Sequence, residues 1–426
     1  MKKMPERYVG KNIYKVDAQD KVTGKAIYPD DIYFDDMLYL KIKRAVHPHA
    51  YLRRISISKA EKFPGVVKII TAADIPEVKN FGLIIKDQPV LVGIGQKMRY
   101  MGDALAIVIA ESKEVASQAV NLIEVEVEEL EIISDPLRAM DESAPLIHKN
   151  GNILVTHYLE KGDIKKGFTQ ADVIVENEYR TSFLDQVPLQ VEAGVGIYDE
   201  ESEVIKLWVA SQWLHDTQAD IAQSLGIAKE KVRIIQPVIG GAFGKKEDIS
   251  VHIYLALAAI ATKRPVKLTY TREESMTAQS KRHPFIIRAK TGATKEGYLT
   301  AWQVEVIGDT GACASSGLAV VHKGMYHCTG PYNVDNVKGV AYTVYTNNTY
   351  AGAMRGFGAT QMAFAYESQM DVLAHKLGFD PIQFRLQNAY DIGSSTPNGQ
   401  ILTHSVGVKE TINKAAEIAG WKGGPR

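Results

Sequence analysis

A glycine-rich loop is the first segment whose residue types suggest chemistry. It reads Gly240-Gly241-Ala242-Phe243-Gly244 and lies between two apolar runs, Val232 to Ile235 and Ile249 to Thr262. Paired glycines adopt backbone conformations closed to other residues and let a ligand approach the main chain. Amides just before the second run, a predicted helix, would face a bound anion. A P-loop is excluded because no Ser or Thr follows Lys245, and a purely structural strand-to-helix turn remains the alternative.

Two further segments place polar groups where a ligand could meet them. Arg355 and Phe357 stand among glycines in a loop before an amphipathic stretch. The arginine could bind an anion and the phenylalanine could stack on a flat ring, or the two could satisfy carbonyls and fill the core. Gln212 follows a strand-like run. Its amide, if buried, could donate to an oxo group without adding charge, or it could be an ordinary strand-end residue.

Short strands and helices must position these segments. Strand-like runs alternate with one or two helices over residues 1–133, which predicts a mixed α+β domain. Residues 134–151 contain two prolines and no periodic pattern, so we expect them to link this domain to a second one over residues 152–426. Within the second domain, the turn Lys295-Glu296-Gly297 predicts a hairpin. Gly378 and the pair Asp380-Pro381 predict the end of one helix and the capped start of the next.

Composition limits the classes of protein that remain. Fifty basic residues balance fifty acidic ones, so no net field attracts nucleic acid or an anionic membrane. The longest apolar run, Ile253 to Ala261, is too short to span a bilayer, and no signal peptide is visible, which predicts a cytoplasmic protein. The two cysteines, Cys313 and Cys328, are expected to be buried and structural, since an iron–sulfur cluster takes about four thiolates.

Together and in this order, the three segments resemble the molybdopterin-binding subunit of the xanthine dehydrogenase and aldehyde oxidase family. That family has a Ser-or-Thr-Gln-Asn strand end, a Gly-Gly-Gly-Phe-Gly-Gly-Lys loop and an Ala-Phe-Arg-Gly-Phe-Gly loop. Residues 282–284, 291–297 and 308–312 also match, and residues 24–30, 48–50 and 102–103 resemble its α/β hammerhead domain. The resemblance covers essentially the whole chain. The departures from the family pattern are Ala242, Lys245 and Met354.

The resemblance implies a fold and a role for each segment. An α/β hammerhead domain over residues 1–133 would precede the first molybdopterin-binding α+β domain over residues 152–426. The cofactor would lie on the glycine loop. Gln212 and the backbone of Phe243 and Arg355 would hydrogen-bond the oxygen ligands of molybdenum without coordinating the metal. The residues implied to contact the substrate are Glu247, Lys323 and Phe357, of which Lys323 stands where several relatives have arginine.

The resemblance also implies partner chains. The family's catalytic glutamate has no counterpart before Arg426, so the base would come from a second molybdopterin subunit. Within the family the chain is most similar to the large molybdopterin subunit of split, nicotinate dehydrogenase-type enzymes. The implied cofactor is molybdenum–molybdopterin in its cytosine dinucleotide form, with FAD and [2Fe-2S] clusters on two further subunits.

The implied reaction is the hydroxylation of an electron-poor carbon in a small heteroaromatic ring, with water as the oxygen source and a general base to activate it. Nicotinate would use the cation of Lys323, whereas a purine or xanthine would use Glu247. The choice between these substrates is open at this point. A different class of function, a non-catalytic scaffold subunit without cofactor, is open as well.

Overall fold

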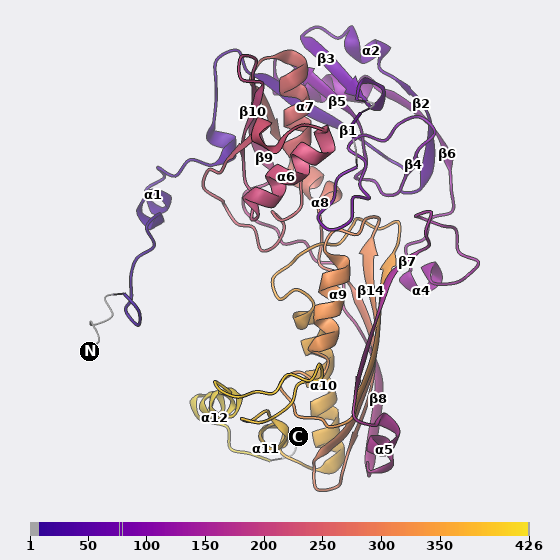
Figure 1. The fold of residues 1–426 in the computed structure, drawn as a ribbon, viewed down its shortest axis with the longest axis vertical. Coiled ribbons are helices and arrows are strands. Elements are labelled where there is room, and N and C mark those ends of the chain that lie inside the picture. Colours follow the sequence, from indigo (N-terminus) through magenta and orange to yellow (C-terminus); the bar gives the residue numbers. More distant parts are fainter. Residues whose placement is uncertain (1–7, 76, 79, 425–426) are drawn as a thin grey trace.

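The computed structural model describes residues 8–75, 77–78 and 80–424 of the chain. They form an elongated molecule with two sheets in its upper half and one long sheet in its lower half (Figure 1). An N-terminal arm that carries the short helix α1 (Ala18–Val22) projects from the upper half. The mixture of strands and helices confirms the predicted α+β class.

A seven-stranded sheet joins parts of the chain from both sides of the predicted linker. Strands β1, β3 and β5 come from residues 1–133, and β9 to β12 come from residues 152–426. The two groups meet where β1 and β12 pair in parallel. In order across the sheet, the strands are β11 (Val232–Ile235), β10 (Val204–Val209), β9 (Ala193–Asp199), β12 (Val266–Thr269), β1 (Leu38–Arg44), β5 (Ala104–Ala110) and β3 (Val66–Thr71). The predicted domains thus share a sheet, and their boundaries stay a prediction.

A three-stranded sheet completes the upper half. It consists of β4 (Lys97–Met98), β2 (Ala50–Ser56) and β6 (Glu124–Glu129). The segment predicted as a linker, residues 134–151, follows it and contains the short helix α4 (Pro136–Ala139). Ala144 and Ile147 of this segment are buried in one core cluster with Ile307 and Val344 of the lower sheet. The connection between the halves is therefore packed against the protein.

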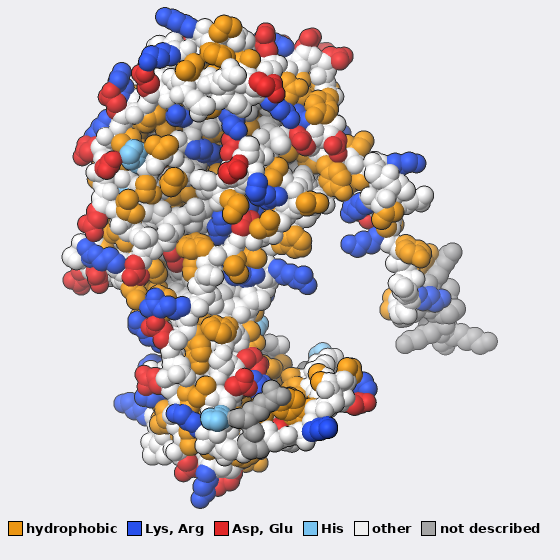
Figure 2. Space-filling view, turned by 180° about the vertical axis from the view of Figure 1, so that it is seen from behind, with side chains coloured by type: hydrophobic (Ala, Val, Ile, Leu, Met, Phe, Trp, Pro, Cys, Tyr) orange, Lys and Arg blue, Asp and Glu red, His pale blue; other side chains and the backbone are white. Residues whose placement is uncertain are grey.

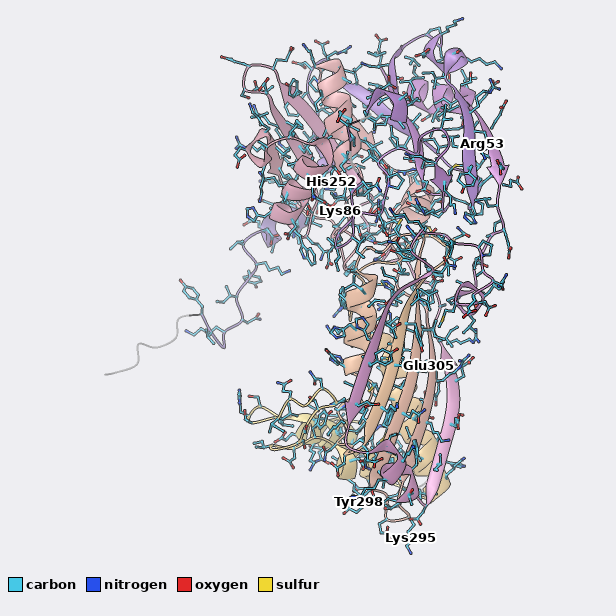
Figure 3. The ribbon with its side chains drawn as sticks, turned by 45° about the vertical axis from the view of Figure 1, so that its right-hand side comes forward. Arg53, Lys86, His252, Lys295, Tyr298 and Glu305 are labelled. Carbon is cyan, nitrogen blue, oxygen red and sulfur yellow. The ribbon has the colours of Figure 1, made fainter. Side chains whose placement is uncertain are left out.

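The lower half is built on a five-stranded sheet. Its strands, in order, are β7 (Ile153–Lys161), β15 (Val337–Tyr345), β14 (Leu299–Gly311), β13 (Phe285–Ala293) and β8 (Val173–Arg180). The antiparallel pairing of β13 with β14 confirms the predicted hairpin. Its turn lies at the lower tip, where Lys295 and Tyr298 are labelled in Figure 3, well below Lys86 and His252 in the upper half.

Helices cover the sheets. α7 packs on β9 and β10 of the upper sheet, and α9 and α10 pack on the lower one. Glycine allows the first of these contacts, because a Cβ at Gly196 would lie 3.0 Å from the carbonyl oxygen of Leu255 in α7. The helices after α1 are α2 (Ser58–Glu61), α3 (Lys113–Ala119), α4, α5 (Ile164–Thr169), α6 (Leu214–Leu225), α7 (His252–Thr262), α8 (Arg272–Ala278), α9 (Gly317–Tyr326), α10 (Ala359–Leu377), α11 (Pro381–Asn388) and α12 (Val408–Ile418).

Local signals at helix ends are confirmed. Gly378 ends α10 in the left-handed conformation with φ of 71°, which glycine adopts without strain. The Asp380 side chain accepts hydrogen bonds from the backbone of Ile382 and Gln383, and Pro381 occupies the first turn of α11. Both terminal signals act within a few residues, and so they can be recognised in the sequence.

Three expectations from composition can be compared with the structure. Cys313 and Cys328 are buried and free, as predicted. Figure 2 shows basic and acidic side chains interspersed over the face it presents, without a broad region of one sign. Among the described residues, no helix combines the length and apolar character needed to cross a bilayer.

Candidate functional site

The glycine loop lies between β11 and α7, and its backbone is held in conformations that favour glycine. Gly241 and Gly244 have φ angles of 101° and 104°, and Phe243 has 57°. Within the described part of the chain, the amides of Gly241, Ala242 and Phe243 have no hydrogen-bond acceptor. The Phe243 side chain is 50% exposed. The loop therefore has three consecutive N–H groups without an acceptor in the described chain, next to the exposed Phe243.

The loop around Arg355, residues 353–358, packs directly on the glycine loop. A Cβ on Gly244 would lie 2.3 Å from the carbonyl oxygen of Ala353, so only glycine permits this approach. The Arg355 amide donates to the carbonyl oxygen of Phe243 at 3.0 Å. Gly358, at the end of the same loop, lies equally close to α9, because a Cβ on it would be 2.2 Å from the carbonyl oxygen of Val320. The two loops, over 100 residues apart in sequence, form one unit.

Gln212 joins this unit from the end of β10. Its Oε1 accepts a hydrogen bond from the Gly244 amide at 3.0 Å, and its backbone amide donates to the carbonyl oxygen of Lys246 at 2.9 Å. The structure thus brings together the segments that carry Gln212, Phe243 and Arg355. Gln212 is exposed, so the condition of a buried amide is not met. Strand β10 ends at Val209, which leaves Gln212 in the following turn.

The donors of the three segments differ in their availability. The Arg355 N–H, predicted to serve molybdenum's oxygen ligands, is directed at the Phe243 carbonyl. The Phe243 N–H has no acceptor among the residues that the structure describes. The side-chain nitrogen of Gln212 lies 3.4 Å from Glu247 Oε1, a long hydrogen bond. The roles assigned to all three residues therefore stay predictions.

Glu247 lies beside Gln212 in a half-buried position. It lines a small pocket of about 150 Å³ that also includes Lys86, Thr217 and Asp220. Its Oε2 is buried without a hydrogen-bond partner within the described residues. Burial, and next the charge of Asp248, raises the pKa of Glu247 to about 7. The side chain can therefore change between donor and acceptor near neutral pH.

Lys323 forms a pair with Phe357 of the Arg355 loop. Lys323 lies on α9, and its Nζ is 5.8 Å from the centroid of the Phe357 ring, within the range of a cation–π contact. The Lys323 side chain is exposed, and Phe357 is partly buried against the lower core with φ of 51°. An aromatic surface with a nearby cation is suited to a ring that carries an anionic group.

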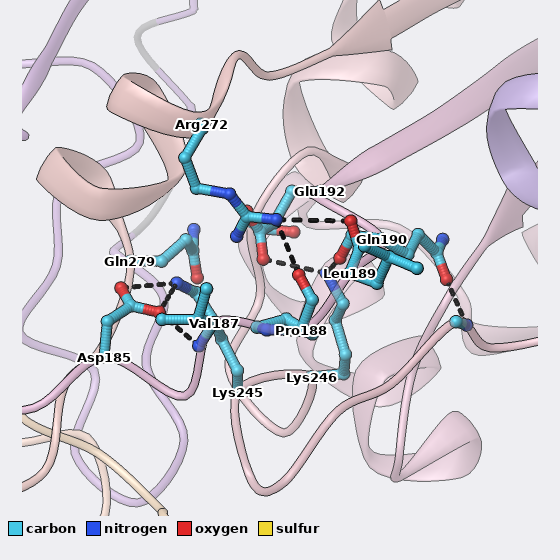
Figure 4. A network of polar contacts seen from close by, with 12 residues as sticks. Asp185, Val187, Pro188, Leu189, Gln190, Glu192, Lys245, Lys246, Arg272 and Gln279 are labelled. Atoms are coloured by element: carbon cyan, nitrogen blue, oxygen red, sulfur yellow. Dashed lines mark hydrogen bonds and ion pairs between the residues drawn. The ribbon is translucent and has the colours of Figure 1, made fainter.

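The two lysines that follow the glycine loop point away from its accessible side. Lys245 is fully buried, and its Nζ donates to both carboxylate oxygens of Asp185 at 2.7 Å (Figure 4). Lys246 is paired with Glu192 at 2.8 Å. Lys245, a departure from the resembled family's loop, therefore leaves the accessible face of the loop free.

The sequence motifs do not identify residues 185–192, the segment whose acidic side chains pair with these lysines, as part of the site. The available signal is weak: two acids and two glutamines flank Pro188 in a stretch without strand or helix periodicity. Such a pattern is typical of any polar loop. The structure reveals its importance because the acids are 5% and 1% exposed and are paired with lysines of a distant loop.

These features suit an oxygen-rich, anionic group. Adjacent unpaired amides favour acceptors with negative charge, and glycine lets such a group approach the main chain closely. Among the described residues, no cluster of His, Cys, Asp or Glu could hold a metal directly. The donor set itself fits an anionic group held through hydrogen bonds from the main chain.

Comparison with known proteins first defines the class. Residues 147–389 match the molybdopterin cofactor-binding domain. Residues 23–131 match the a/b hammerhead domain of aldehyde oxidase and xanthine dehydrogenase. The predicted order of hammerhead and molybdopterin-binding regions is thereby confirmed, and the site lies within the second of them.

Individual relatives then define the family. The chain is 44% identical over 411 residues to the nicotinate dehydrogenase large molybdopterin subunit of Eubacterium barkeri, and the match covers 96% of each chain. It is 38% identical over 380 residues to a probable xanthine dehydrogenase subunit of Bacillus subtilis (strain 168), of which the match covers 51%. The chain belongs to the xanthine dehydrogenase family of molybdenum hydroxylases.

A solved structure supports the same assignment. The aldehyde oxidoreductase of Desulfovibrio gigas superposes with a TM-score of 0.89 at 30% identity, over 95% of this chain and 46% of that one. The chain therefore spans about half the length of the Bacillus subtilis and Desulfovibrio gigas proteins, and nearly all of the Eubacterium barkeri subunit.

Proposed function

We propose that this chain is the large molybdopterin-binding subunit of a split molybdenum hydroxylase that acts on a small, electron-poor heteroaromatic ring of the nicotinate type. The observation that carries the proposal is the hydrogen-bonded unit of three distant segments. Gly244 donates to Gln212, Arg355 donates to Phe243, and the amides of residues 241–243 have no acceptor among the described residues. The near-complete match to a nicotinate dehydrogenase subunit supports the split form and the substrate class.

The chain would bind the cofactor through main-chain donors. The amides of Gly241, Ala242 and Phe243 would donate to its oxygen atoms, with the side-chain nitrogen of Gln212 as a further donor. Such donors are fixed before the reaction, which lowers the cost of stabilising charge that develops in the transition state. When bound, molybdenum–molybdopterin, which we propose to be the cytosine dinucleotide form, supplies the two-electron redox centre.

Substrate orientation would use the remaining site residues. A heteroaromatic ring would stack on Phe357 while its carboxylate pairs with Lys323. Glu247, with a pKa of about 7, would donate a hydrogen bond to a ring nitrogen in its protonated state. A purine is the second candidate, favoured by the unpartnered Oε2 of Glu247, because a purine presents donors and acceptors along one edge.

The rest of the enzyme would come from partner chains. A second molybdopterin subunit would supply the base that activates water, and iron–sulfur and FAD subunits would carry the electrons away. The match to a protein named as a large molybdopterin subunit supports partner chains. The free amides of the glycine loop favour this assignment over a scaffold without cofactor.

The test is to purify the chain together with the products of neighbouring genes. Molybdenum is measured by elemental analysis, and the pterin nucleotide is identified after its release by acid. We expect stoichiometric molybdenum, cytidine monophosphate from the cofactor, and hydroxylation of nicotinate in preference to xanthine. A stable complex free of molybdenum and pterin would support the scaffold function instead, and preferential turnover of xanthine would support the purine alternative.

A further inference from the structure

The two loops of the site are both tied to a third segment, residues 185–190, here called the bridging segment. It follows β8, contains no helix or strand, and lies beside Lys245 and Lys246 (Figure 4). None of its residues belongs to the proposed cofactor-binding or substrate-binding set. Its contacts therefore require an explanation of their own.

Asp185 begins the bridging segment and binds lysines from two different parts of the chain. Its carboxylate accepts from Lys245, which directly follows the glycine loop, at 2.7 Å and from Lys281 at 3.0 Å. Lys281 in turn pairs through its backbone with the residues that lead into the Arg355 loop, donating to Tyr350 and accepting from Gly352. One carboxylate is thus shared between the anchors of both loops.

The rest of the bridging segment contacts the loop backbones directly. Gln186 Nε2 donates to the carbonyl oxygen of Ala353 at 2.8 Å, next to the point where Gly244 meets the same residue. Gln190 Oε1 accepts from the Gly240 amide at 2.6 Å, and the Gln190 backbone amide donates to the Gly240 carbonyl at 3.1 Å. Each loop therefore receives at least one hydrogen bond from this segment.

The bridging segment is itself rigidly held. Val187 has a φ of 41°, a conformation that a β-branched residue keeps only when its surroundings enforce it. Its amide donates to Asp185, and Arg272 donates to the Pro188 carbonyl at 2.7 Å. Because the segment is held in one conformation, it can fix the positions of the two loops that it contacts.

We propose that the bridging segment sets the placement of the glycine loop relative to the Arg355 loop, with Asp185 as the principal positioning residue. This inference rests on the proposed function, because the amides so placed are those proposed to hold the cofactor. Buried ion pairs are costly to form and tolerate little displacement, so a shared carboxylate specifies geometry more than it adds stability. Burial, and next the neighbouring Lys245, lowers the pKa of Lys281 to about 8, which reflects how strongly the cluster is desolvated.

A pair of variants separates positioning from stability. Asp185→Asn replaces the ion pairs with at most a neutral hydrogen bond to the amide oxygen, and it leaves two buried lysines without their counter-charge. Asp185→Asn combined with Lys281→Met also removes the ion pairs but returns the cluster to its original formal charge. If Asp185 positions the loops, the double variant regains thermal stability without regaining the loop geometry.

The experiment uses the full chain purified with its partners and measures three quantities. They are the melting temperature, molybdenum per chain, and hydrogen–deuterium exchange of peptides covering residues 240–247 and 353–358. We expect Asp185→Asn to raise exchange in both peptides by about tenfold, the equivalent of one charge-assisted hydrogen bond, and to lower the molybdenum content severalfold. The double variant should recover the melting temperature while exchange and molybdenum stay at the Asp185→Asn values.

Controls keep the test decisive. Glu367→Gln breaks a partly buried pair with Arg385 on α10 and α11, outside both loops, and should lower the melting temperature alone. Gln186→Met, a milder change, should raise exchange only in the 353–358 peptide and serves if Asp185→Asn does not fold. Parent-like exchange and molybdenum in Gln186→Met, or their full recovery in the double variant, would overturn the proposal. Absence of molybdenum from the parent complex would overturn the proposed function, while the exchange data would still test the bridging segment.

Discussion

Gly244→Ala is expected to separate the two loops on which the site depends. The residue has a φ of 104°, and its hydrogen atom faces the Ala353 carbonyl group of the neighbouring loop. A Cβ at this position would lie 2.3 Å from the Ala353 oxygen and 2.5 Å from its carbon. Both atoms belong to the backbone, so no side-chain rotation relieves the contact.

The expected loss of stability follows from three contributions. An L-residue in the left-handed region costs about 1–2 kcal/mol. Relieving the contact requires the loops to move apart by about 1 Å, since non-bonded carbon atoms prefer about 3.5–4.0 Å. That movement breaks the Arg355–Phe243 and Gly244–Gln212 hydrogen bonds, each worth about 0.5–1.5 kcal/mol. We therefore expect a decrease of about 2–5 kcal/mol in the free energy of unfolding.

The matched control is Gly226→Ala at the end of α6. Gly226 has a φ of 68°, but a Cβ there meets no atom within 4 Å. It should lose only the conformational contribution of about 1–2 kcal/mol. Unfolding by urea and the molybdenum content of the purified complex are measured for both variants. If both lost the same stability and kept the same molybdenum, the close packing of the loops would not hold the site together.

Three further predictions concern individual side chains. Glu247 has a pKa raised to about 7 by burial and by Asp248, so it is neutral below and charged above that pH. Affinity for a carboxylate substrate should therefore fall as the pH rises through 7, and an unchanged pH profile in Glu247→Gln would contradict this role. Gln212→Ala should fold normally while kcat falls by about a hundredfold, the usual effect of losing one preorganised donor; loss of folding would show a structural role instead. Lys323→Met should raise KM for nicotinate about tenfold, equivalent to the loss of one charge-assisted hydrogen bond, whereas Lys323→Arg should retain affinity. Equal KM values for Lys323→Met and the parent would show that the lysine does not contact the substrate.

Much of the local structure could be predicted from the sequence. The bounds of β11 agree with the predicted apolar run from Val232 to Ile235, and Gly378 and Asp380 mark helix ends as expected. These signals act over a few residues, through side-chain periodicity and backbone conformation. The identity and order of the three site segments were equally readable, because each is a continuous run of residues.

Which residues meet across the fold was decided by tertiary structure. The sequence shows that Lys245 departs from the family's loop pattern. It could not show that the Lys245 side chain is buried, because its partner Asp185 lies 60 residues earlier in the chain. In the same way, no local pattern reveals that strands before and after residues 134–151 share one sheet. A buried charge must find an opposite charge wherever packing places one, and that choice depends on the whole fold. The sequence thus determined the chemistry of each loop, and the tertiary structure determined how the loops are held together.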